Sequence, residues 1–161
     1  MNHLPRIAGA GALLAINLLF ISVWGFAGIS KVMSGMPSYF PGKFGKTFLG
    51  SFPGLTATFW LLTLSELLAL TLAVVALVRV EFLERKPTAV LPAMLAWSLF
   101  VFVQLGFGQW LTNDFNGAFQ QFAYFSGTLL ALHFVMSSST LQRLRVTEST
   151  LKAPPNTPAA I

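Results

Sequence analysis

The chain has 161 residues, of which 55% are hydrophobic and only 9% are charged, and its formal net charge is +5. Soluble proteins usually carry about 25% charged residues, so this composition predicts one integral membrane domain and excludes an ordinary soluble enzyme. The sequence contains no cysteine, which excludes disulfides, thiolate-ligated iron–sulfur clusters and reactive thiols. The basic residues lie in loops and tails, as in membrane proteins, so the positive charge does not indicate binding to nucleic acid.

Four stretches are apolar enough to cross a bilayer, for which about 20 residues suffice. These stretches cover residues 7–30, 55–78, 89–111 and 118–139. Only the second contains a charged residue, Glu66. We therefore predict an all-α, four-helix transmembrane bundle over residues 1–140 and a cytoplasmic tail over residues 141–161. The first stretch is longer than the roughly 7–15 apolar residues of a signal peptide, so we expect it to be a true span.

The distribution of arginine and lysine predicts the orientation of the bundle. With four spans, both termini and the loop at residues 79–88 share one side of the membrane. That side holds Arg6, Arg79, Arg85, Lys86, Arg143, Arg145 and Lys152, whereas the other side holds Lys31, Lys43 and Lys46. The positive-inside rule then places both termini in the cytoplasm.

The loop at residues 31–54, between the first two spans, is rich in glycine, proline and aromatic residues. Its phenylalanines recur every four residues, at Phe40, Phe44, Phe48 and Phe52. On a helix they would form one stripe, which predicts an interfacial or re-entrant segment over the outer mouth of the bundle. The alternative is a poorly ordered loop with accidental spacing.

Glu66 lies near the middle of the second span, where a charged side chain costs at least about 2.5–3.5 kcal/mol. Helical spacing places it on one face with Thr56, Thr63, Ala69 and Ala73. Small and hydroxyl-bearing residues mark helix contacts in lipid, so we expect Glu66 to face the bundle, either protonated or hydrogen-bonded. It is interpreted as a proton-carrying group or as a ligand for a polar head such as a quinone carbonyl. A structural hydrogen bond is the alternative.

Three further polar residues are candidates for a substrate-binding site with Glu66. Asn17 lies at a similar depth in the first span and is a candidate partner of Glu66, although a polar contact between helices explains it as well. Gln104 and Tyr124 lie in the outer halves of the third and fourth spans and would line a pocket above Glu66. Ordinary placement of such residues near helix ends is an equal alternative.

His133 is the candidate cofactor-binding residue. It falls on the opposite face of the fourth span from Tyr124, because nine residues separate the two. It either faces outward, against another protein or a bound pigment or haem, or forms a hydrogen bond inside the bundle. The only other histidine is His3, so ligation of haem by two histidines of this chain is not expected. No catalytic or metal-binding motif stands out.

Two short segments resemble elements of the DoxX-like family of four-helix membrane proteins. Residues 26–32 (FAGISKV) are similar to the G-x-x-K element that ends the first helix of that family, and residues 65–74 (SELLALTLAV) resemble its second helix. The resemblance covers about residues 7–136 and implies a bundle in the bacterial inner membrane. The family is named for a membrane subunit of a thiosulfate–quinone oxidoreductase. The matching positions are Gly28, Lys31 and Glu66.

Together these features predict an accessory subunit of a larger membrane redox complex, respiratory or photosynthetic, that stabilises assembly and contacts lipid or quinone. We expect it not to be catalytic alone. The alternatives are a quinone-binding subunit in which Glu66 exchanges protons, and a small transporter or channel, although no internal repeat is visible. The expected partners are other membrane subunits and lipids. The expected cofactors are a quinone, a lipid, or a pigment or haem shared with a partner.

Overall fold

The computed structural model describes residues 4–83 and 89–152, and side-chain surroundings are described for residues 7–83 and 89–138. Every regular element within these ranges is helical, which confirms the all-α class. The long helices are α1 (Leu4–Trp24), α5 (Leu55–Val78), α6 (Val90–Leu111) and α7 (Phe115–Lys152). The short elements are the π-helical turn η1 (Gly25–Ile29), α2 (Ser30–Ser34), α3 (Tyr39–Phe44) and α4 (Phe48–Ser51).

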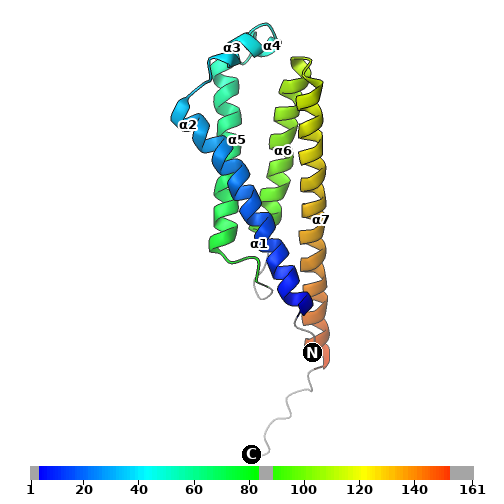
Figure 1. Ribbon diagram of the computed structural model, residues 1–161. Helices are drawn as coiled ribbons and strands as arrows, with labels where there is room; N and C mark the ends of the chain where they lie inside the picture. Colours follow the sequence, from blue (N-terminus) through cyan, green and yellow to red (C-terminus); the bar gives the residue numbers. More distant parts are fainter. Residues whose placement is uncertain (1–3, 84–88, 153–161) are drawn as a thin grey trace, which may run out of the picture.

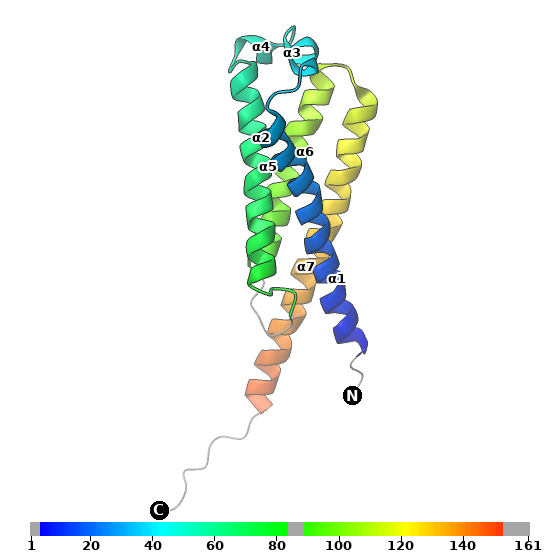
Figure 2. The ribbon, with the colours of Figure 1, turned by 60° about the vertical axis from the view of Figure 1, so that its left-hand side comes forward.

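The helices α5, α6 and α7 stand side by side in chain order, and α1 lies obliquely across them (Figure 1). Because α1 is oblique, α2 lies beside the upper part of α5, below the level of α3 and α4 (Figure 2). We call residues 35–54, which contain α3 and α4, the cap. The cap covers the end of the bundle where α5 begins and α6 ends, and the start of α1 lies at the opposite end.

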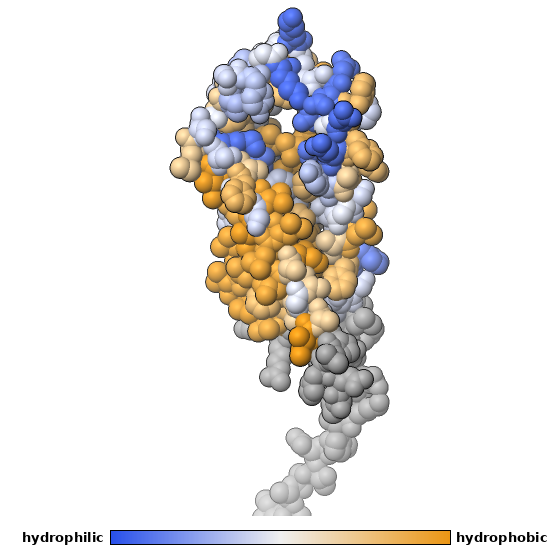
Figure 3. Space-filling view, viewed as in Figure 1, coloured by the Kyte–Doolittle hydropathy of each residue, from blue (hydrophilic) through white to orange (hydrophobic). Residues whose placement is uncertain are grey.

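Three helical stretches are long and apolar enough to cross a membrane, namely Ile7–Ser34, Leu55–Val78 and Val90–Leu111. They coincide with the first three predicted spans, so the chain is a multi-pass membrane protein. On the face shown in Figure 3, hydrophobic residues cover the middle of the molecule, and hydrophilic residues gather at the end that carries the cap. Large apolar side chains of the apolar helices, such as Leu64 and Phe100, are exposed, as expected where lipid surrounds a helix.

The helix α7 is longer than the predicted fourth span, because it includes residues 141–152, which the sequence assigned to a tail. Residues 128–153 contain neither glycine nor proline, the residues that most readily end a helix. The loss of hydrophobicity after residue 139 therefore does not end the helix, and α7 projects beyond the lower ends of α5 and α6 (Figure 1). The rest of the predicted tail, residues 153–161, lies outside the described residues.

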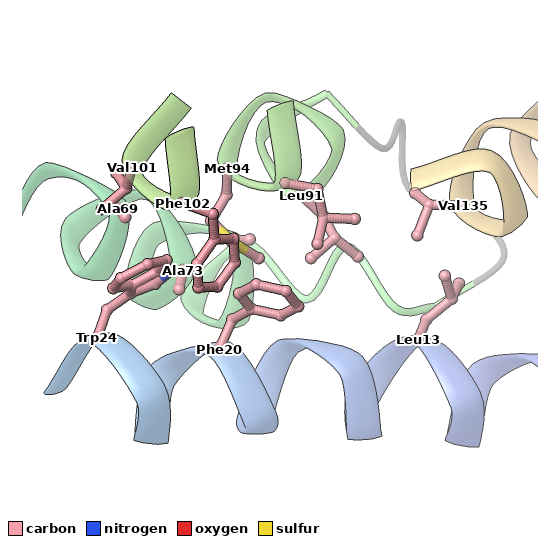
Figure 4. Packing of buried hydrophobic residues seen from close by; sticks show 12 residues of the cluster. Leu13, Phe20, Trp24, Ala69, Ala73, Leu91, Met94, Val101, Phe102 and Val135 are labelled. Atoms are coloured by element: carbon pink, nitrogen blue, oxygen red, sulfur yellow. The ribbon is translucent and has the colours of Figure 1, made fainter. Parts of the chain in front are cut away.

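The main hydrophobic core joins all four long helices. From α1, Phe20 and Trp24 point toward α5 and α6, where the small residues Ala69 and Ala73 leave room for them (Figure 4). The indole N–H of Trp24 donates to Ser98 Oγ at 2.9 Å, so this buried aromatic residue has its polar group satisfied. Small residues at such contacts let helices approach closely in lipid.

At the end of the bundle opposite the cap, a buried carboxylate caps the first turn of α6. Glu81 is 2% exposed. Its Oε2 accepts hydrogen bonds from the backbone N–H groups of Ala89, Val90 and Leu91 at 3.2, 2.9 and 2.9 Å. A helix N-terminus carries unpaired N–H groups and a partial positive charge, so Glu81 caps α6 from a distance in the sequence.

Candidate functional site

Glu66 faces the interior of the bundle, as predicted, with an exposure of only 1%. Its two carboxylate oxygens accept hydrogen bonds from Lys31 Nζ at 2.7 and 2.8 Å. The Lys31 side chain is less deeply buried, at 24% exposure. Both residues belong to stretches that are apolar enough to cross a membrane. An isolated charge there would be costly, so the ion pair explains how this apolar helix carries a carboxyl group.

A wide helical turn and a glycine bring Lys31 to Glu66. The π-helical turn η1 separates α1 from α2, and such turns change the direction in which the following side chains point. Within η1, Gly28 is buried, and a Cβ atom at this position would lie 3.0 Å from Leu67 Cδ2. Glycine therefore permits the close approach of η1 to α5. The three positions of the DoxX-like resemblance, Gly28, Lys31 and Glu66, thus meet at one point of the fold.

Asn17 does not pair with Glu66. Oriented by its surroundings, its side-chain amide donates to the backbone oxygen of Ala73 at 3.0 Å and accepts from the N–H of Leu77 at 3.1 Å. Asn17 therefore joins the backbone of α5 farther from the cap, and the contact between helices is the correct one of its two interpretations. The signal for the true partner was present in the sequence, because Lys31 follows Asn17 at twice the seven-residue helical spacing.

The predicted face of α5 is buried except at its beginning. Thr63 and Ala69 are fully buried, whereas Thr56 is exposed. The prediction fails at Thr56 because α2 ends below this level, so that α1 and α2 do not cover the first turn of α5 (Figure 2). There the cap replaces them, through a cluster of Phe40 and Phe44 with Phe59 of α5.

The prediction that the four phenylalanines of the cap form one stripe is only partly correct. Phe40 and Phe44 share α3 and pack with ring centroids 4.6 Å apart, and Phe40 meets Phe59 edge to face at 5.7 Å. Phe48 and Phe52 are 54% and 77% exposed. The stripe divides because the chain turns between α3 and α4 instead of continuing one helix. Placement of this segment in a membrane interface stays a prediction.

A second ion pair fastens the cap to the turn between α6 and α7. Lys43 Nζ donates to Gln109 Oε1 at 2.7 Å and to Asp114 Oδ2 at 2.9 Å. Asp114 also accepts from the N–H of Gly117 at 2.9 Å, so its side chain caps α7. In the same turn Asn113 has a φ of 56°, a value that asparagine tolerates. The turn makes α6 and α7 antiparallel, as predicted.

The cap and the adjoining ends of α5 and α6 line a partly open cavity of about 360 Å³, which we call the cap pocket. Its wall is mainly apolar, with side chains such as Phe40, Phe44, Phe59, Leu62 and Leu105. The polar groups on the wall include Lys31, Lys43, Gln104 and Gln109. The volume falls within the range of about 300–1,000 Å³ for small-molecule sites. Lys31 lines the pocket and binds the buried Glu66, whereas Glu66 itself does not line the pocket.

Of the predicted site residues, only Gln104 lies on the wall of the cap pocket. Its Nε2 is 3.4 Å from Ser65 Oγ, and the neighbouring indole of Trp97 donates to Ser65 O at 2.9 Å. Tyr124 packs against Phe102, with ring centroids 5.7 Å apart, and is 55% exposed. It does not line this pocket.

His133 is exposed on α7, which agrees with the outward one of its two interpretations. Among the residues whose side-chain surroundings are described, 7–83 and 89–138, no three histidine, cysteine or acidic side chains lie close enough to hold a metal ion. Sequence analysis named Lys31 through the resemblance but not as the partner of Glu66. It missed Lys43, which reaches the pocket wall only when the cap folds over α5 and α6.

Comparison of the chain with models of protein families, with curated proteins and with solved structures finds no match. The DoxX-like resemblance therefore stays a prediction, and the proposals below rest on the geometry of the site.

The pKa of Asp114 provides a test of the contact between cap and turn. Hydrogen bonds from the Gly117 N–H and then from Lys43 lower this pKa below its ordinary value of 3.8. The ionised contacts therefore stabilise the fold above that pH, and their contribution is lost as the pH falls through the lowered pKa. Asp114 is the only aspartate in the sequence, so carbon-13 NMR with labelled aspartate gives one titrating carboxyl resonance.

We expect the midpoint of this titration to lie below 3.8 in the natural chain. In Lys43→Met, which keeps an apolar stem but removes the ammonium group, the midpoint should move upward. A midpoint at or above 3.8 in the natural chain would show that the carboxylate lacks these contacts.

Proposed function

We propose that the chain is a DoxX-like membrane protein of the bacterial inner membrane, with α7 as a fourth span and both termini in the cytoplasm. Three observations support this topology. The helix α7 packs antiparallel along α6. The start of α1 and the end of α7 lie at the end opposite the cap. A topology with four spans assigns seven of the ten basic residues to the side of the two termini.

The natural absence of cysteine makes this topology testable by single-cysteine labelling. In intact cells, a membrane-impermeant maleimide should label Lys46→Cys in the cap. Arg79→Cys, after α5, and Arg145→Cys, in α7, should react only after the inner membrane is permeabilised. Labelling of Arg145→Cys in intact cells, with Arg79→Cys protected, would mean that α7 does not cross the membrane.

The function that the geometry supports best is binding of a quinone-like molecule in the cap pocket, by a subunit of a larger membrane redox complex. The observation that carries this proposal is the ion pair of Lys31 and Glu66, whose lysine lines an apolar cavity of about 360 Å³. An apolar wall with a few polar groups suits a ring with carbonyl oxygens and an apolar tail. The amide of Gln104 and the ammonium group of Lys31 lie on the wall and carry N–H groups that suit such carbonyls.

The ion pair also supplies a path for protons. When a quinol is oxidised it releases protons, and the carboxylate of Glu66 is an acceptor that the ligand reaches through Lys31. The electrons pass to a redox centre in a partner subunit. Glu66 then acts from behind Lys31 and not as a direct contact of the ligand. Intramembrane ionisable residues commonly mark such proton paths.

A second candidate function is assembly alone, as an accessory subunit without a ligand. One observation favours it: His133 is exposed on α7 beside the exposed apolar side chains of Leu130 and Phe134. A histidine among lipid tails is unfavourable, so a neighbouring protein over this face of α7 would explain its position.

Ligand binding separates the two functions. We expect a benzoquinone with a short alkyl tail to bind the purified chain in nanodiscs, as measured by titration calorimetry. Leu62→Trp fills the pocket wall and should weaken binding more than about tenfold, which is 1.4 kcal/mol. Leu64→Trp is the matched control, because Leu64 lies on the same helix but is 62% exposed away from the pocket.

In the intact complex, Glu66→Gln should abolish quinol-linked turnover while the subunit still assembles. If the natural chain binds no quinone but still co-purifies with partner subunits, the assembly function is correct and the quinone site is not.

A further inference from the structure

Two lysines line the wall of the cap pocket, and each is paired with a carboxylate that lies outside the pocket. Lys31 is held by Glu66 at 2.7 and 2.8 Å, and Lys43 is held by Asp114 at 2.9 Å. Neither carboxylate lines the pocket, whereas both lysines do. A ligand in the pocket therefore meets two positive groups whose charges are already balanced.

The hydrogen-bond donors of the two lysines are also largely used within the protein. Lys31 donates to both oxygens of Glu66 and, at 3.5 Å, to Ala27 O, and Lys43 donates to Gln109 and Asp114. The other polar side chains on the wall are neutral, namely those of Tyr39, Thr58, Gln104 and Gln109. Gln104 makes only a long contact of 3.4 Å through its nitrogen. Within the described residues, Gln109 is engaged through its oxygen, by Lys43.

From this arrangement we propose that Glu66 and Asp114 set the charge selectivity of the cap pocket: it takes amphiphiles with neutral, hydrogen-bonding heads and rejects anionic ones. The inference rests on the proposed function, because it requires that the pocket hold a ligand. An anionic head beside either lysine lies nearer the ammonium group than the paired carboxylate, so the carboxylate cancels only part of the attraction. The remaining attraction does not offset the cost of removing an anion from water, whereas a neutral head loses less hydration.

The two acids differ in how strongly they act. Glu66 is 1% exposed, so its charge is little screened by solvent. The side chains of Asp114 and Lys43 are 38% and 30% exposed, so solvent screens the charge of Asp114. Removal of Asp114 should therefore change selectivity less than removal of Glu66. It is also the safer variant, because asparagine at this position still caps α7.

The test compares a fluorescent alkyl sulfonate with the alcohol of the same chain length, on the full chain in nanodiscs of neutral lipid. The natural chain should bind the alcohol more tightly than the sulfonate. Asp114→Asn should lower the ratio of the two affinities by about fivefold, and Glu66→Gln should lower it by about tenfold or more. Helical content and monodispersity show whether each variant is folded.

The matched control is Glu81→Gln, which makes the same change in net charge at the opposite end of the bundle, where Glu81 caps α6. It should leave the ratio unchanged. The inference is overturned if the natural chain prefers the sulfonate, or if folded Asp114→Asn and Glu66→Gln change the ratio no more than the control does. If neither probe binds the natural chain, the proposed binding function falls as well, and the inference falls with it.

Discussion

The ion pair between Lys31 and Glu66 is the interaction on which the rest of this structure depends. A single carboxyl group in an apolar helix must be neutral or paired, and here both of its oxygens are bound by one ammonium group. To supply that group, α1 must lie obliquely, turn through η1 and pack Gly28 closely against α5. The path of the chain from α1 to the cap follows from this requirement.

A buried ion pair is weak evidence for stability, because the cost of removing two charges from water offsets most of their attraction. What such a pair provides here is position. It holds α2 at one level of α5, places a lysine on the wall of the cap pocket and keeps its carboxylate behind that wall. The pair of Lys43 and Asp114 does the same for the cap, at a more exposed place where the energy involved is smaller. One buried and one partly exposed ion pair thus border a pocket whose walls are apolar and whose two lysines are each paired with a carboxylate.

The sequence was sufficient for the features that depend on composition and local pattern. Long apolar stretches predicted α1, α5 and α6 as spans, and small residues on one face of α5 predicted that Glu66 points inward. The four consecutive spans predicted the antiparallel pair α6 and α7. Each of these rests on the length of an apolar stretch or on helical spacing within it.

The features that the sequence did not predict join segments far apart in the chain. Asn17 and Lys31 lie on the same predicted face of the first helix, and only the packing of α1 against α5 decides which of them reaches Glu66. The pocket forms when the cap folds over α5 and α6, so Lys43 could not be recognised from local spacing. Tyr124 was placed at the pocket because helical phase shows which residues share a face, and not which face meets a neighbour.

The most direct test of this account is a double-mutant cycle on the central pair, with the free energy of unfolding measured in mixed micelles. Lys31→Met and Glu66→Gln should each lower it by about 3–5 kcal/mol, because each leaves the other partner without its hydrogen bonds. The double variant should lose markedly less than the sum, with a coupling energy of about 2 kcal/mol or more. Additive losses would show that the two side chains do not form the pair, and would contradict the site built on it.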